Sequence, residues 1–133
     1  MKRECLNCGH DDMEYGTRNV PYAYRGYKRV IENIRGWHCT ECHEVEFDTG
    51  EGVRFASAIE QISQEIDAHE AAELARIRKK LKLTQHEAAK LTGGGPNAFS
   101  RYERGKATPV LAVTNLFKLL DHHPNLLDEI RPS

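Results

Sequence analysis

The chain has 133 residues, a hydrophobic content of 39%, a charged content of 29% and a net charge of −1. This composition excludes a disordered chain, and no apolar run approaches the roughly 18 to 20 residues that a membrane span needs. The first ten residues, MKRECLNCGH, carry no apolar segment behind their basic side chains. We therefore predict no secretory signal and expect a cytosolic protein.

The near-neutral net charge hides an asymmetry along the chain. Residues 51–75 carry one basic and six acidic side chains, whereas residues 76–133 carry 11 basic and 5 acidic ones. A basic C-terminal half favours contact with a polyanion such as nucleic acid. A second interpretation, in which the basic run from Arg76 to Lys82 is only a solvated helix face, fits the charges equally well.

All four cysteines fall in two pairs, Cys5-x-x-Cys8 and Cys39-x-x-Cys42. Disulfides are disfavoured in a reducing cytosol, and four thiolates on two tight turns suit a tetrahedral zinc ion. The pattern predicts one structural Zn²⁺ per chain, bound by all four sulfurs. The segment between the pairs is longer than the roughly 15 to 20 residues that are common in such sites. We expect it to fold as a small sheet that brings the pairs together.

Other chemistries for these cysteines are less well supported. A thioredoxin-like redox pair would need a βαβ setting, and catalytic zinc would need a coordination position that four cysteines do not leave open. His10, His38 and His43 flank the pairs and could replace a cysteine, although we favour nearby surface or supporting roles. Iron could take the place of zinc. No cluster of Ser, His and Asp or of paired carboxylates indicates an enzyme.

The residues between the cysteine pairs favour strands, including a hairpin that turns at Arg25-Gly26. A sheet this small buries little apolar surface, so metal binding should supply much of its folding free energy. Tyr22, Tyr24 and Tyr27 form a partner surface or, as we favour, cover the sheet and the cysteine pairs. Trp37 is expected in the core or as a cover of the cysteine pairs. The predicted strands span residues 13–17, 20–24 and 27–31, and residues 36–38 lead into the second pair.

Apolar residues then recur at helical spacing, at Phe55, Ile59, Ile62 and Ile66. This stripe predicts an amphipathic helix that packs on the zinc module or, less favoured, on a second chain. Asp67 and Glu70 form a capping box for a new helix. We therefore predict a zinc-binding domain at 1–67 and a helix-turn-helix domain at 68–133. No Pro- or Gly-rich linker separates them, so a continuous helix through the boundary is an open alternative.

Five short helices are predicted in the second domain. The first covers about 70–81, and a capping box of Thr84 and Glu87 begins the second. The turn Gly93–Gly95 leads to a third helix with Pro96 in its first position and Gly105 at its end. A fourth begins at Thr108-Pro109, and a last turn or short helix lies within 124–130. The predicted buried residues are Leu74, Ile77, Leu81, Ala88, Leu91, Phe99, Tyr102, Val113, Leu116, Phe117 and Leu120.

Two helices joined by a short glycine-containing turn form a helix-turn-helix, whose second helix enters the major groove of DNA. Asn97 and Arg101 lie four residues apart on the outward face of that helix. Asn and Arg are the side chains that read adenine and guanine bidentately, so we predict base contacts for both. The alternative is that the arginines of this helix are ordinary surface residues. Candidate phosphate contacts are Ser100, Arg104, Lys106 and the helix start at Thr84 and Gln85.

Two stretches carry a resemblance to known proteins. LTQHEAAKL (83–91) followed by FSRYERG (99–105) and Pro109 resembles the helix-turn-helix of the phage-repressor and Xre type. Together with the cysteine pairs, the whole chain resembles the MqsA (YgiT-type) family of antitoxins. The motifs that carry this resemblance are C-x-x-C-G, PYAYRG, the second C-x-x-C, RKKLKLTQ, GGGPNAFSRYE and HPNLLDEIR.

The expected fold is α+β, with a small β-rich zinc domain and an all-α, phage-repressor-like domain. The resemblance implies the antitoxin of a type II toxin–antitoxin system, which dimerises through its C-terminal domain and represses its own operon by binding a palindrome in the promoter. Its zinc domain would neutralise an RNA-cleaving toxin, through contacts that the resemblance does not assign. The protein would be cytoplasmic, and at the nucleoid when bound to DNA. Carried over to this chain, the zinc ligands are Cys5, Cys8, Cys39 and Cys42, and the base contacts are Asn97 and Arg101.

A second function is compatible with the same residues. The protein would be a zinc-containing helix-turn-helix repressor that has no toxin partner and whose zinc module senses metal or binds another ligand.

Overall fold

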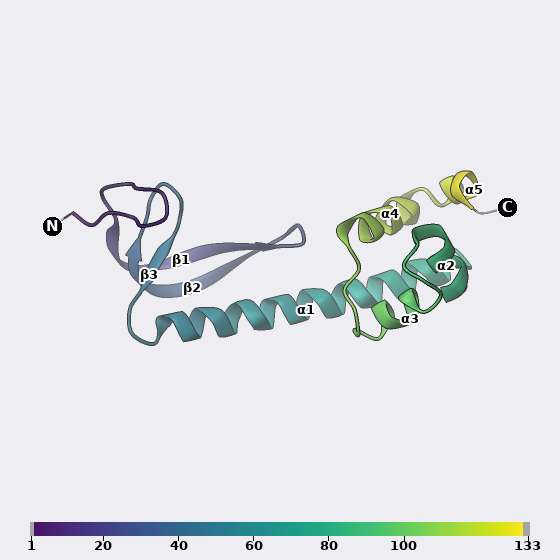
Figure 1. The fold of residues 1–133 in the computed structure, drawn as a ribbon, viewed down its shortest axis with the longest axis horizontal. Coiled ribbons are helices and arrows are strands. Elements are labelled where there is room, and N and C mark those ends of the chain that lie inside the picture. Colours follow the sequence, from purple (N-terminus) through teal and green to yellow (C-terminus); the bar gives the residue numbers. More distant parts are fainter. Residues whose placement is uncertain (1, 132–133) are drawn as a thin grey trace. The chain divides into compact units, whose positions relative to one another are not determined.

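The computed structural model describes residues 2–131 and confirms the α+β class (Figure 1). The chain divides into two compact units, with the boundary between Gln64 and Glu65. We call them the N-terminal unit and the C-terminal unit. The long helix α1, Glu51–Lys80, begins in the first and ends in the second. No helix within the described residues is both long and apolar enough to cross a membrane.

The N-terminal unit contains a three-stranded antiparallel sheet in the order β1-β2-β3. The strands are β1 (Glu14–Tyr24), β2 (Tyr27–His38) and β3 (Val45–Phe47). The first two form the predicted hairpin, and its turn residues Arg25 and Gly26 have φ angles of 50° and 85°. Two consecutive residues with positive φ are typical of a type I′ turn, whose twist matches that of the paired strands.

Both strands of the hairpin are longer than predicted, because a bulge joins the predicted segments into continuous strands. The pairing register shifts between Arg18 and Val20. Opposite this shift, Asn33 has a φ of 59°, and its amide donates to the Asn19 Oδ1 at 3.1 Å. The interrupted alternation in the sequence therefore marks a bulge and not a loop between separate strands.

One face of this sheet packs against the first half of α1, as the apolar stripe of that helix predicts. A close approach between β2 and β3 also requires a glycine, since a Cβ added to Gly36 would lie 2.2 Å from the backbone oxygen of Glu46. The sheet contributes Val20, Ile31, Ile34 and Val45 to the core, and the helix contributes Phe55, Ala58, Ile59 and Ile62.

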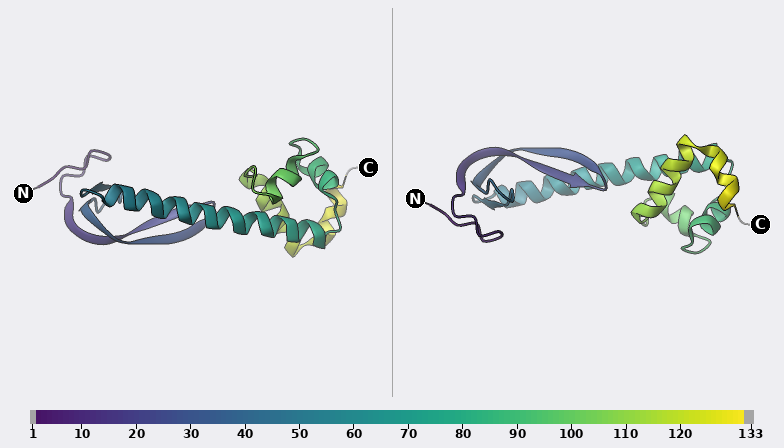
Figure 2. Two further views of the ribbon diagram at one scale, coloured as in Figure 1. Left: turned by 90° about the horizontal axis from the view of Figure 1, so that it is seen from below. Right: turned by 90° about the horizontal axis from the view of Figure 1, so that it is seen from above.

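The predicted helix boundary at Asp67 is wrong, because α1 is a single helix of 30 residues (Figure 2). Asp67 lies in its interior and does not cap a new helix. From Val53 to Lys80 the sequence has no glycine or proline and is rich in Ala, Glu and Gln, which favour helix. Without a glycine or proline to break the helical backbone, the local capping signal at Asp67 does not interrupt the helix.

The C-terminal unit packs the last part of α1 against the remaining helices. These are α2 (Gln85–Thr92), α3 (Ala98–Glu103), α4 (Leu111–His122), a 3₁₀ turn η1 (Pro124–Leu126) and α5 (Leu127–Ile130). Phe99 of α3 is fully buried, with ring centroids 5.1 Å from Phe117 and 5.5 Å from Tyr102. The other buried members of this core are Leu74, Ile77, Leu81, Leu83, Ala88, Ala89, Ala98, Val113, Leu120 and Leu127, with Leu91, Tyr102, Leu116 and Leu126 partly buried against them.

Two helices of this unit begin later than predicted. Pro96 and Asn97 form a turn before α3, in which the Ala98 amide donates to the Gly95 carbonyl at 3.2 Å, so Pro96 is not the first helical residue. Val110 has an extended backbone with a ψ of 154°, so α4 begins at Leu111 and not at Thr108-Pro109. In both cases the helix begins two residues after the proline.

The C-terminal end of α1 closes with a Schellman motif. The Leu83 amide donates to the Arg78 carbonyl and the Lys82 amide to the Lys79 carbonyl, at 3.1 and 3.0 Å. This pair of hydrogen bonds places Lys82 in the left-handed region, with a φ of 61°. Leu83 and Ile77 share the same core cluster, which supplies the apolar contact typical of the motif.

We expect Lys82→Gly to raise the free energy of unfolding by about 1 kcal/mol, because glycine adopts positive φ without the steric cost that a side chain brings. Chemical denaturation of the purified protein measures the change. The matched control is Lys79→Gly, three residues earlier and inside the helix, which should lower stability by about 1 kcal/mol. Equal destabilisation by both substitutions would contradict the assignment of strain to Lys82.

Candidate functional site

The structure brings the four predicted cysteines together in one cluster. Their sulfur atoms all lie within 4.8 Å of one another, and this group includes no histidine, aspartate or glutamate among the described residues. The Sγ atoms of Cys5 and Cys42, and those of Cys8 and Cys39, are 3.6 Å apart. A tetrahedral ion with metal–sulfur bonds of about 2.3 Å requires sulfur separations of about 3.8 Å. The donor set therefore fits a single tetrahedral metal ion.

The two cysteine turns have the same backbone design. The amide of Cys5 donates to the His10 carbonyl at 2.7 Å, and the amide of Cys39 donates to the Glu44 carbonyl at 2.9 Å. In each turn the residue four positions after the first cysteine returns a hydrogen bond to that cysteine and has a positive φ, 82° at Gly9 and 66° at His43. His43 therefore serves as a turn residue and lies outside the sulfur cluster.

The register of the hairpin places the two turns side by side. Residue Glu14, which opens β1 after the first turn, pairs with His38, which closes β2 before the second. The long segment between the cysteine pairs thus runs out along β1 and returns along β2. His38 is buried, and its Nε2 lies 2.9 Å from the Ile34 carbonyl oxygen and 3.2 Å from that of Gly16. It supports the strands next to the cluster and is not part of it.

Two of the sulfurs are shielded from solvent. Cys5 and Cys39 are 1% and 2% exposed, whereas Cys8 is exposed and Cys42 half-buried. Met13 and Trp37 pack against the cluster. Because Trp37 packs against Cys5 and Cys39, it covers the cysteine turns, which is one of its two predicted roles. The Arg3 guanidinium lies 5.0 Å from the centre of its ring.

The thiols of the cluster differ in acidity. A hydrogen bond from the Asn7 side chain, aided by one from the Glu44 backbone, lowers the pKa of Cys42 to about 6. A backbone hydrogen bond from His10 also favours the thiolate of Cys8, but desolvation and the neighbouring thiols outweigh it and raise the pKa of Cys8 to about 12. Four sulfurs at this separation do not all ionise without a cation between them. This is the electrostatic condition that a divalent metal ion satisfies.

The second candidate site lies on α2 and α3 of the C-terminal unit. The predicted capping box is confirmed, since the Glu87 amide donates to the Thr84 Oγ1 and the Thr84 amide donates to the Glu87 Oε1, both at 3.0 Å. The Thr84 oxygen therefore already caps α2. Its neighbour Gln85 is half-buried and donates its side-chain amide to the Glu103 Oε1 at 3.3 Å.

Asn97 and Arg101 lie close together at the start of α3. Asn97 occupies the position before the first helical residue, and the Arg101 amide donates to its carbonyl at 3.1 Å. Both side chains are exposed, and within the described residues neither has a hydrogen bond or ion pair. Their amide and guanidinium groups are thus available to a ligand. Arg104 and Lys106 are also exposed and Ser100 is half-buried, with the Arg104 Nε donating to the Ser100 carbonyl at 3.2 Å.

The basic run from Arg76 to Lys82 is engaged largely within the protein. Arg76 and Lys80 both bind Asp121, at 2.8 Å, and Arg78 binds Glu103 at 2.7 Å. This run therefore contributes less to a polyanion-binding surface than its composition indicates. No sequence spacing pointed to these pairs, because the partners lie 25 to 45 residues apart in the chain.

The match to a protein-family model and the similarity to a known protein indicate the same family. The family model described as "Antitoxin component of bacterial toxin-antitoxin system, MqsA" matches residues 1–131. The chain is 39% identical over 130 residues to Antitoxin MqsA of Escherichia coli (strain K12), covering 96% of this chain and 99% of that protein. A solved structure of the N-terminal domain of the E. coli protein MqsA aligns with 27% identity and a TM-score of 0.43, covering 50% of this chain and 98% of that one. The chain belongs to the MqsA family, the antitoxin components of bacterial toxin–antitoxin systems.

Proposed function

We propose that this antitoxin combines two activities. Its N-terminal domain (1–67) holds a structural zinc ion and neutralises a cognate, RNA-cleaving toxin, and its C-terminal domain (68–133) binds a palindrome in its own promoter and represses the operon. One observation carries this proposal. A member of the antitoxin family has both a four-sulfur cluster and a helix-turn-helix in which the side chains of Asn97 and Arg101 make no hydrogen bond or ion pair within the described residues. A four-thiolate site requires reduced cysteines, which is consistent with a cytoplasmic protein.

Zinc suits the sulfur cluster best among divalent ions. Four thiolates in tetrahedral geometry favour Zn²⁺ or iron, and zinc adds no redox chemistry. Bound at Cys5, Cys8, Cys39 and Cys42, it would leave no open coordination position and would act structurally. The apolar core of the sheet is small, so metal binding would stabilise the fold of this unit directly.

We expect the purified protein to contain one zinc ion per chain by elemental analysis. Replacing the buried ligand in Cys39→Ser should lower the metal content well below one and expose the N-terminal unit to proteolysis, because three ligands no longer close the site. His10→Ala is the matched control: it removes a neighbouring imidazole and should keep full occupancy. Full zinc occupancy in Cys39→Ser would refute the site.

In the C-terminal domain, α3 would enter the major groove with Asn97 on an adenine edge and Arg101 on a guanine edge. Arg104, Lys106, Ser100 and the start of α2 at Thr84 and Gln85 would contact phosphates, which set the register of the protein on DNA but not the choice of sequence. The Gln85 amide is shared between this role and its hydrogen bond to Glu103.

We expect Asn97→Ala and Arg101→Ala each to lose about 1 to 3 kcal/mol of discrimination between the promoter duplex and a scrambled duplex of equal composition. Fluorescence anisotropy titrations on both duplexes measure this difference. Lys106→Ala serves as the contrasting variant and should weaken binding to both duplexes alike. It should also reduce the salt slope, which is the slope of the logarithm of the binding constant against the logarithm of the salt concentration, by about 1. If Asn97→Ala and Arg101→Ala weakened both duplexes equally, the base-contact assignment would fail.

The palindromic site implies a dimer, for which α4 offers a surface. Leu111 and Leu119 are 47% and 51% exposed, and their spacing of about two helical turns places them on one side of the helix. Covering both leucines in a dimer would remove their apolar surface from water. A two-fold dimer through this surface would match the two half-sites of a palindrome. A monomer mass in sedimentation at micromolar concentration would contradict the dimer.

The decisive test of the antitoxin function is co-expression with the adjacent gene of the operon. We expect the product of that gene to copurify with this protein, and its growth arrest to be relieved by the wild-type chain. Arg101→Ala should still relieve the arrest while losing repression of a promoter reporter, and Cys39→Ser should lose the relief. If the neighbouring protein neither copurified nor was neutralised, the toxin partner would be refuted and only the repressor function would stand.

A further inference from the structure

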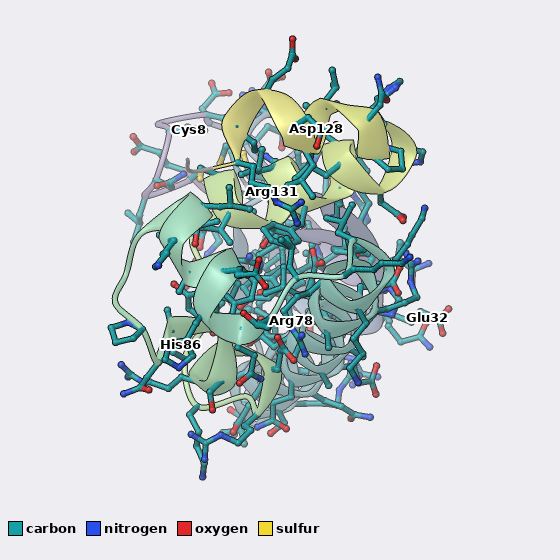
Figure 3. The ribbon with its side chains drawn as sticks, turned by 90° about the vertical axis from the view of Figure 1, so that its right-hand side faces the viewer. Cys8, Glu32, Arg78, His86, Asp128 and Arg131 are labelled. Atoms are coloured by element: carbon teal, nitrogen blue, oxygen red, sulfur yellow. The ribbon has the colours of Figure 1, made fainter. Side chains whose placement is uncertain are left out.

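Arg78, in the last turn of α1, forms a side-chain network with α3. Its Nε and one terminal nitrogen donate to the two carboxylate oxygens of Glu103, at 2.7 and 2.9 Å. Its other terminal nitrogen donates to the Leu83 carbonyl at 2.8 Å, and Gln85 adds a hydrogen bond to the same carboxylate. One guanidinium thus connects α1, the loop before α2 and the end of α3. Arg78 is labelled in Figure 3.

This network is largely removed from solvent. The side chains of Arg78 and Glu103 are 12% and 9% exposed, whereas most other ion pairs of the unit are far more exposed. A bidentate pair of this kind fixes direction as well as distance, because a planar fork meets a planar carboxylate. Lysine would retain the charge but lose the two parallel hydrogen bonds.

The helix α3 has few other constraints on its orientation. It is six residues long, too short to be stable without tertiary contacts. The turn before it consists of Gly93, Gly94 and Gly95, with φ angles of 80°, 91° and 90°, and no side chain caps its start at Asn97. Ala98 and Phe99 bury the first turn of the helix in the core, and Tyr102 packs partly buried against it. These apolar contacts are not directional, so the bidentate bond of Arg78 to Glu103 at the far end adds the constraint that fixes the rotation of the helix.

We propose that Arg78 is a positioning residue for DNA reading: by binding Glu103 it sets the orientation in which α3 presents Asn97 and Arg101. This inference rests on the proposed DNA-binding function. It predicts that Arg78 governs the ratio of affinities for the promoter site and for unrelated DNA, although its own side chain does not contact a base. Contacts to phosphates, which tolerate small rotations of α3, depend on it much less.

The chain provides a matched control in Arg76, two residues earlier on the same helix. Arg76 also binds two carboxylates, Glu73 and Asp121, but neither belongs to α3. Its side chain is 49% exposed. Arg76→Met therefore removes one positive charge and its ion pairs from α1 and leaves the Arg78–Glu103 network in place.

The experiment uses the full-length, zinc-loaded protein and measures affinity for the promoter duplex and for a scrambled duplex at several salt concentrations. We expect Arg78→Met to reduce the affinity ratio by on the order of tenfold, with a smaller reduction for Arg78→Lys and Glu103→Gln. Affinity for the scrambled duplex and the salt slope should stay within about twofold of wild type, since the phosphate contacts remain. Arg76→Met should keep the wild-type ratio.

Thermal unfolding of each variant separates positioning from folding. If Arg78→Met does not fold, Arg78→Lys and Glu103→Gln, which conserve size, decide the question. A folded variant with an unchanged affinity ratio, or with equal losses on both duplexes, would overturn the positioning role while leaving the DNA-binding function intact. If the wild-type protein itself bound both duplexes with equal affinity, the result would contradict the proposed sequence-specific DNA binding, whatever the variants of Arg78 showed.

Discussion

The apolar stripe of α1 is the constraint on which both units depend. In its first half, Phe55, Ile59 and Ile62 pack on the sheet, and in its second half Leu74 and Ile77 belong to the core of the C-terminal unit. Each of the two apolar cores therefore includes side chains from this helix. Because no glycine or proline interrupts the sequence between the two parts, hydrogen bonding of the backbone continues through the boundary between the units.

Each unit has a small apolar core and, in addition, one cluster of directional interactions between polar or metal-binding side chains. Domains of this size bury a modest fraction of their surface, so directional interactions carry a larger share of their stability and uniqueness. In the N-terminal unit this is the sulfur cluster, which ties the two ends of the hairpin together. In the C-terminal unit it is the Arg78–Glu103 pair, which joins elements that are distant in sequence. The Arg78–Glu103 pair lies at the end of α3, the helix that carries Arg101.

Much of the fold and of the candidate sites could be predicted because their signals are local. The C-x-x-C pairs, the Thr84–Glu87 capping box and the inward position of Phe99 each depend on residues within one or two turns of one another, and the structure has all three. The predictions that proved wrong share a different cause. In each of them a local signal misplaces a helix start. The helical propensity around Asp67 overrides its capping signal, and the helices after Pro96 and Pro109 begin two residues beyond the proline. The role of Arg78 was missed altogether, since a basic run gives no indication of which of its members face inward.

By itself, the sequence determined the residue types and short spacings that the chemistry needs: two pairs of thiols, a capped helix, a glycine turn, and Asn97 one helical turn before Arg101. Tertiary structure alone decided which of these groups meet. The pairing of Glu14 with His38 brings the cysteine turns together, and the packing of α3 against α1 gives Glu103 its partner 25 residues away. The physical reason is that backbone hydrogen bonds and caps form between near neighbours, whereas strand register and buried ion pairs depend on contacts that exist only once the cores have formed.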